Sequence, residues 1–180
     1  MERRVLKGVL GCPNCRERYP IEGGYGDLRP APRPEEPRSP GGSEDDPEAA
    51  LRLAALLGVA EGPGLILLLD GSTRHADRIA AMVEGIEVVA AAPGLRRLDE
   101  HPGVSRVGIP DRLPFFSGAL RGVVLEGARG RDLLTEGVRV LGRRSRLVFL
   151  EPDEGVKSEM AALGLELLME AETVLVGARK

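Results

Sequence analysis

The chain has 180 residues, a formal net charge of −3, and hydrophobic and charged fractions of 42% and 29%. This composition is typical of a globular protein, and it indicates no general attraction to nucleic acid or to acidic membranes. No apolar run approaches the roughly 20 residues that cross a bilayer, and the N-terminus lacks a signal-peptide core, so we expect a cytoplasmic protein without a membrane partner.

The first segment, residues 1–28, is rich in turn residues and contains Cys12 and Cys15 in the pattern Cys-Pro-Asn-Cys. Two cysteines are too few for a disulfide scaffold, but two thiolates at this spacing can bind one metal ion from the same side. Zinc takes four ligands, so this pair supplies half of a site. We expect either a zinc-bridged homodimer or an empty, reduced pair.

The stretch from Cys12 to Pro30, CPNCRERYPIEGGYGDLRP, has the cysteine pair followed by Tyr-Pro-Ile and a glycine-rich turn. It resembles the zinc-ribbon module of the activator subunit of tRNA and rRNA methyltransferases. In that family an earlier cysteine pair completes the zinc site, and this chain has no earlier pair. The resemblance implies a small β-rich knuckle that docks on a catalytic methyltransferase.

Residues 29–47 contain many prolines and almost no apolar side chains, so they cannot bury enough surface to offset the cost of ordering. We expect a mobile linker between the knuckle and a domain at residues 48–180. The alternative, a proline-rich ligand for a recognition domain, is much rarer than a linker of this kind.

The domain is organised around residues 64–85. Five consecutive aliphatics at 65–69 predict a strand that is buried on both faces, as in a parallel sheet, and apolar spacing from Ala76 to Val83 predicts a helix. We expect Ser72 or Thr73 to be the N-cap of this helix. Ligands of doubly wound folds bind at the carboxyl ends of the strands, so a cofactor is expected at the intervening turn.

The other elements alternate along the chain. A helix is expected from Asp46, its N-cap, to Gly58, which ends it. Strands are predicted at 86–90, 104–109, 122–126 and 146–150, helices at about 131–141 and 156–163, and two final strands joined near residue 171. Alternating strands and helices with a terminal strand pair predict an α/β sandwich.

Two further segments carry a resemblance: LPFFSGALRGVVLEG, from Leu113 to Gly127, and VRVLG, from Val138 to Gly142. In this order and spacing they resemble class I S-adenosylmethionine-dependent methyltransferases over nearly all of residues 48–179. The resemblance implies a Rossmann-like sandwich with a mostly parallel sheet, a C-terminal antiparallel strand pair, and S-adenosylmethionine as the cofactor.

The cofactor positions depart from that family. The turn Asp70-Gly71-Ser72-Thr73 has one glycine where the family has a glycine-rich turn, and the second strand ends at residues 90–92 in three alanines where the family has a ribose-binding acid. Before Leu-Pro-Phe, only Asp111 could replace the family's adenine contact. We therefore expect a degenerate site in which Asp70, Gly71, Ser72, Thr73 and Asp111 are the candidate cofactor residues.

Several residues have both a chemical and an ordinary structural interpretation. The turn at 70–73 could cradle an anion, although capping by Ser72 or Thr73 explains it too. His75 could act in acid–base chemistry, but a lone histidine is usually solvated. Phe115 and Phe116 could line a cleft or pack in the core, and solvated charge explains the arginine pairs at 96–97 and 143–144.

Two functions remain open. The first is a non-catalytic binding or regulatory partner, a pseudoenzyme that associates with a second copy or with a catalytic methyltransferase. The alternative is an active S-adenosylmethionine-dependent methyltransferase in which Asp70 or Asp111 replaces the missing carboxylates. Nucleic acid is not indicated as a partner, and the substrate cannot be deduced from the sequence, because a fold does not by itself specify a reaction.

Overall fold

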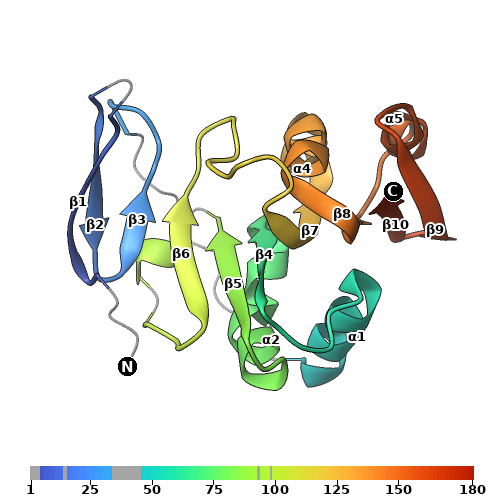
Figure 1. Cartoon of the computed structure of the whole chain (residues 1–180), viewed down its shortest axis with the longest axis horizontal. Coiled ribbons are helices and arrows are strands. Elements are labelled where there is room, and N and C mark those ends of the chain that lie inside the picture. The colour runs from blue at the N-terminus through green and yellow to red at the C-terminus, as the bar shows by residue number, and fades with distance from the viewer. Residues whose placement is uncertain (1–4, 14–15, 34–45, 93, 98) are drawn as a thin grey trace.

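The computed structural model describes residues 5–13, 16–33, 46–92, 94–97 and 99–180. Within them, ten strands form one sheet (Figure 1). The strands are β1 Lys7–Gly11, β2 Arg18–Glu22, β3 Tyr25–Asp27, β4 Gly64–Leu69, β5 Ile86–Ala91, β6 Val104–Gly108, β7 Leu120–Glu126, β8 Leu141–Leu150, β9 Leu165–Ala171 and β10 Val174–Arg179. The helices are α1 Pro47–Leu57, α2 Ala76–Met82, α3 Gly127–Asp132, α4 Leu134–Val140 and α5 Val156–Ala162, with 3-10 helices η1 Asp70–His75 and η2 Leu95–Arg97.

The strand order is β1-β2-β3-β6-β5-β4-β7-β8-β10-β9. Neighbouring strands from β3 to β8 run parallel, whereas β10 runs antiparallel to both β8 and β9. The expected mostly parallel sheet with a C-terminal antiparallel pair is therefore confirmed. The chain leaves β4 in one direction to β5 and returns to its other side at β7, which makes the carboxyl end of β4 a topological switch point.

β4 lies at the centre because both of its faces are covered. Residues 66–69 are fully buried, and their side chains alternate between two cores. Ile66 and Leu68 belong to the core that includes α1 and α2, while Leu67 and Leu69 belong to the core that includes α4 and α5. Helices on both faces explain the unbroken aliphatic run.

The predicted limits of α1 are confirmed. The Asp46 carboxylate accepts hydrogen bonds from the backbone N–H groups of Glu48 and Ala49 at 3.0 and 3.1 Å, and Gly58 ends the helix with φ of 69°. The single helix expected at 131–141 is wrong in detail, since α3 and α4 form two short helices there. Because Leu141 already pairs with Leu120, β8 begins at Leu141, earlier than predicted.

The N-terminal strands extend the main sheet. β3 pairs in parallel with β6, and the buried Arg106 donates hydrogen bonds to the carbonyl oxygens of Gly23 (2.7 Å) and Leu95 (3.1 Å). The segment is thus held by backbone and side-chain bonds to the rest of the sheet, in addition to any linker. The boundaries at residues 28 and 47 stay predictions, and residues 34–45 of the linker lie outside the described residues.

In the described part of the chain, no helix is long and apolar enough to cross a membrane.

Candidate functional site

The turn after β4 is the candidate site. It forms η1 at the edge of the sheet where the parallel strands end, and it begins at Asp70, whose φ of 50° is unusual for a residue other than glycine. Asp70, Gly71, Ser72 and Thr73 are therefore brought together at the switch point, as expected. Asp111 is exposed in the loop after β6 and has no hydrogen bond or ion pair to any described residue, and its role in a cofactor site stays a prediction.

The predicted N-cap is wrong. The Ser72 hydroxyl donates to the Leu69 carbonyl oxygen at 2.7 Å, and the Thr73 hydroxyl donates to the Asp70 carbonyl oxygen at 2.6 Å. Both hydroxyls close the turns of η1, and α2 starts only at Ala76, without a side-chain cap. The hydroxyl protons of both side chains are therefore used within the turn itself.

Glu126, the last residue of β7, occupies the space beside Gly71. A Cβ atom built on Gly71 would lie 2.7 Å from both carboxylate oxygens of Glu126. Oε2 is buried and accepts no hydrogen bond from the described residues. The chain therefore places its own carboxylate against the glycine of the turn.

The electrostatics of Glu126 follow from this position. Burial raises the pKa of its carboxyl group, the Arg74 charge and the Ser72 N–H lower it, and the charges of Asp70 and Glu151 raise it further; the net pKa lies above the ordinary value. A carboxyl group that is costly to ionise can serve in acid–base chemistry, but it can also simply fill space.

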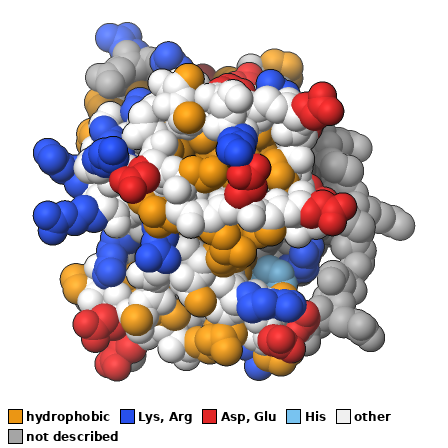
Figure 2. All heavy atoms as spheres, turned by 90° about the vertical axis from the view of Figure 1, so that its right-hand side faces the viewer, with side chains coloured by type: hydrophobic (Ala, Val, Ile, Leu, Met, Phe, Trp, Pro, Cys, Tyr) orange, Lys and Arg blue, Asp and Glu red, His pale blue; other side chains and the backbone are white. Residues whose placement is uncertain are grey.

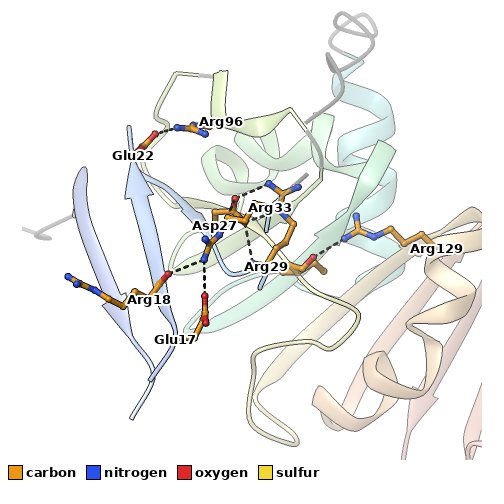
Figure 3. A network of polar contacts seen from close by, with 9 residues as sticks. Glu17, Arg18, Glu22, Asp27, Arg29, Arg33, Arg96 and Arg129 are labelled. Carbon is orange, nitrogen blue, oxygen red and sulfur yellow. Dashed lines mark hydrogen bonds and ion pairs between the residues drawn. The ribbon is translucent and has the colours of Figure 1, made fainter. Parts of the chain in front are cut away.

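An ion pair links the turn to the other side of the switch point. Arg129, in α3, donates to the Asp70 carboxylate at 2.7 Å and to the Ile109 carbonyl oxygen at 3.4 Å. This ion pair is the dashed contact drawn at Arg129 in Figure 3. The pair connects β4, α3 and the end of β6 across the region where a cofactor would lie.

Residues 90–92, at the end of β5, have no charged side chain. Ala90, Ala91 and Ala92 are all buried, and so is Ile109 after β6. The carboxylate that would hydrogen-bond a ribose is absent at this position, as the sequence indicated.

A second polar network holds the end of β3 (Figure 3). Arg29 binds the Asp27 carboxylate through two bonds of 2.8 Å, and Arg33 lies 3.7 Å from Glu17 and 3.8 Å from Asp27. Burial raises the pKa of Asp27, but the hydrogen bonds and charges of the two arginines hold it below its ordinary value. Glu22 and Arg96 form a further ion pair between β2 and η2. These contacts are structural, because each charge has a partner within the network.

The metal prediction is not supported. Cys12 follows β1, whereas Cys15 lies outside the described residues. Among the residues that the structure describes, no three or more histidine, cysteine, aspartate or glutamate side chains are grouped so that they could hold a metal ion.

The remaining candidates have separate positions. His75 is buried and accepts a hydrogen bond from the Arg74 guanidinium at 3.1 Å. Phe115 is half-buried, while Phe116 is 90% exposed on the loop before β7. Arg139 fixes this loop by donating to the carbonyl oxygens of Leu113 and Phe115, both at 2.9 Å.

No protein-family model matches the chain, and no curated protein matches its sequence. Among solved structures, tRNA (m1A58) methyltransferase TrmI from Aquifex aeolicus is similar with a TM-score of 0.56 and 12% identity, over 81% of this chain and 72% of that chain. A geranyl diphosphate methyltransferase solved with S-adenosylmethionine has a TM-score of 0.55 and 16% identity, over 74% of this chain and 85% of that one. The [4+2]-cyclase SpnF has a TM-score of 0.55 and 13% identity, and the match spans 76% of this chain and 65% of the cyclase.

These comparisons show a Rossmann-like, methyltransferase-like fold. At such identities they show the fold alone, and the cyclase illustrates that one fold can carry different reactions.

The sequence did not point to Glu126 or Arg129. Both follow from one signal that was available: a polar residue at the carboxyl end of each predicted parallel strand faces the same edge of the sheet. Glu126 ends the fourth predicted strand, and Arg129 lies on the next turn.

Proposed function

We propose that this chain is a methyltransferase-like protein with a degenerate S-adenosylmethionine site, and that it acts as a non-catalytic binding or regulatory partner. The observation that carries the proposal is the Glu126 carboxylate, which lies against Gly71. It takes the space that a cofactor would use at this turn.

The position of this residue opposes binding as well. The methionine part of S-adenosylmethionine would have to displace the Glu126 side chain or lie beside it at the turn. The cofactor would also need the Asp70–Arg129 pair to open if it crossed from β4 to β7.

The missing ribose carboxylate adds to the loss. One charge-assisted hydrogen bond contributes roughly 1.5–3 kcal/mol, and the loss of two such contacts weakens binding about a hundredfold or more. A micromolar site would then be scarcely occupied.

The proposed partner is a second copy or a catalytic methyltransferase. The resemblance of the N-terminal segment to a docking module supports this, and β3 pairs with β6 of the same chain. The segment therefore meets a methyltransferase-like domain within one polypeptide, and its outer strand β1 is one of the two edges of the sheet that a partner could use. We place the protein in the cytoplasm, and zinc at the cysteine pair would need ligands from another chain or from water.

The raised pKa of Glu126 is the observation that favours the alternative, an active methyltransferase. A carboxyl group of this kind at the carboxyl end of a strand can accept a proton from a substrate.

Calorimetric titration with S-adenosylmethionine separates the two functions. We expect no saturable binding in the micromolar range for the native chain, and tighter binding for Glu126→Ala, because that change frees the turn. Glu172→Ala, an exposed acid in the β9–β10 turn, is the matched control and should leave the titration unchanged. Saturable low-micromolar binding by the native chain, lost in Asp70→Ala or Asp111→Ala, would overturn the proposal and restore the enzyme.

A further inference from the structure

The strand β9 forms one edge of the sheet and has an open side. Among the described residues it pairs with β10 alone. Its three central side chains, Leu167, Leu168 and Met169, are 36%, 48% and 42% exposed. Figure 2 views the molecule from this end and shows hydrophobic side chains in the middle of the face, with single charges of both signs among them.

Edge strands of this kind are normally protected by prolines, unpaired charges or bulges. β9 has a register shift at Leu168, which faces no residue of β10, but it contains no proline. Its two charges are neutralised within the chain, because Glu170 lies 2.6 Å from Lys157 and Glu166 lies 3.7 Å from Lys180. The edge is therefore apolar at its centre and electrically balanced at both ends.

The order of side chains along this edge is symmetric about Leu168. Reading outward in either direction, an apolar side chain is followed by a glutamate that has a lysine partner. A two-fold axis brings one surface against an identical one, so a surface of this symmetry is complementary to itself.

We propose that β9 binds β9 of a second copy of this chain in antiparallel register, with Leu168 on the two-fold axis. In this register Leu167 faces Met169 of the second copy, and Glu166 faces its Glu170. Each of these two glutamates keeps the lysine partner of its own copy: Lys180 for Glu166 and Lys157 for Glu170. The cluster of two carboxylates and two ammonium groups therefore has no net charge.

The two sheets become continuous across the axis, and the open backbone groups of β9 gain partners. The contact involves one strand per copy, which is at the small end of specific interfaces, so the dimer forms and dissociates with concentration. The inference does not depend on the state of the cofactor site, and it uses the opposite end of the sheet from the cysteine pair.

Sedimentation velocity of the full chain over a range of concentrations tests this contact. The native protein should show a monomer–dimer equilibrium. Leu168→Lys places two ammonium groups at the axis and should weaken the dimer at least about tenfold, since directly opposed like charges are unfavourable. Leu51→Lys is the matched control, because Leu51 lies on α1 rather than on an edge strand and is exposed to a comparable extent, 59%.

A native protein that stays monomeric throughout, or a dimer that persists in Leu168→Lys, would overturn the proposal. A dimer lost in Cys12→Ser would do so too, since it would place the contact at the N-terminal segment. As an independent measurement, Leu168→Cys in a Cys12→Ser, Cys15→Ser background should cross-link on oxidation. Leu51→Cys, at an exposed position of α1, should not, and equal cross-linking of both variants would contradict the two-fold register.

Discussion

Asp70 combines two opposing contributions to stability that substitution can separate. Its φ of 50° is a left-handed conformation, in which a residue with a Cβ atom is disfavoured by about 1 kcal/mol. Its carboxylate gains the ion pair with Arg129 at 2.7 Å, with side chains that are 25% and 37% exposed. At this exposure the pair contributes about 0.5–1 kcal/mol.

Asp70→Ala loses the ion pair and also loses the local hydrogen-bonding ability with which aspartate tolerates this conformation, so we expect about 1–1.5 kcal/mol of destabilisation. Asp70→Gly loses the same ion pair but removes the steric cost of the left-handed conformation. The greater conformational entropy of glycine in the unfolded chain cancels about half of this gain in stability. The glycine variant should therefore be within about 0.5 kcal/mol of the native protein.

Urea unfolding followed by circular dichroism measures both variants, together with Arg129→Ala and the Asp70→Ala/Arg129→Ala pair. The double-mutant cycle should give a coupling of about 0.5–1 kcal/mol between the two side chains. An alanine variant as stable as the glycine variant would refute the backbone cost, and a coupling of zero would refute the contribution of the ion pair.

Other substitutions test the site and its supports. Burial raises the folded-state pKa of Glu126, so the cost of its ionisation is absent below the unfolded pKa and grows as pH rises to the folded pKa. Glu126→Gln should therefore gain stability relative to the native chain as pH rises from the unfolded to the folded pKa, and a pH-independent difference in urea unfolding would contradict this. Arg139→Ala should destabilise by about 1–3 kcal/mol and speed proteolysis of the loop before β7, because two carbonyl oxygens lose their donor. Arg139 also donates two hydrogen bonds of 2.8 Å to the Glu136 carboxylate, and these lower the pKa of Glu136. Their contribution to stability is present above the unfolded pKa and lost as pH falls through the folded one, and an Arg139→Ala effect that is equal at acid and neutral pH would argue against it. Arg106→Ala should cost about 2 kcal/mol and expose β1 to β3 to protease, whereas unchanged protection would show that strand pairing alone holds the segment. Metal analysis of the monomer should find far less than one zinc per chain, equal in Cys12→Ser, since two thiolates fill half of a tetrahedral site.

Local patterns predicted most of the fold. The aliphatic run at 65–69 required a strand with both faces covered, and the glycine at position 58 required a helix end, so β4 and α1 could be placed from the sequence. The limits of α4 and β8 could not, because Leu141 is in a strand through its pairing with Leu120 rather than through its own neighbours.

The site was harder for a related reason. The turn residues were found because they follow a buried strand directly, whereas the contact of Gly71 with Glu126 joins two strands that the sequence does not show as neighbours. The roles of Ser72 and Thr73 depended on the direction of a hydroxyl proton, since the same residues can accept as an N-cap or donate within a 3-10 turn.

The pairing of β3 with β6 also determines when the first strands can become ordered. Arg106 is 83 residues further along the chain than Gly23, so the N-terminal strands emerge from the ribosome well before the strand that receives them. Contacts of such separation form late in folding, because a long loop must close first. The chain has two tyrosines and no tryptophan, and both tyrosines, Tyr19 and Tyr25, lie in β2 and β3. Tyrosine fluorescence therefore follows the docking of β2 and β3, while circular dichroism follows the whole sheet. A fluorescence change that lags behind the change in circular dichroism during refolding measures the delay between formation of the sheet and docking of these strands.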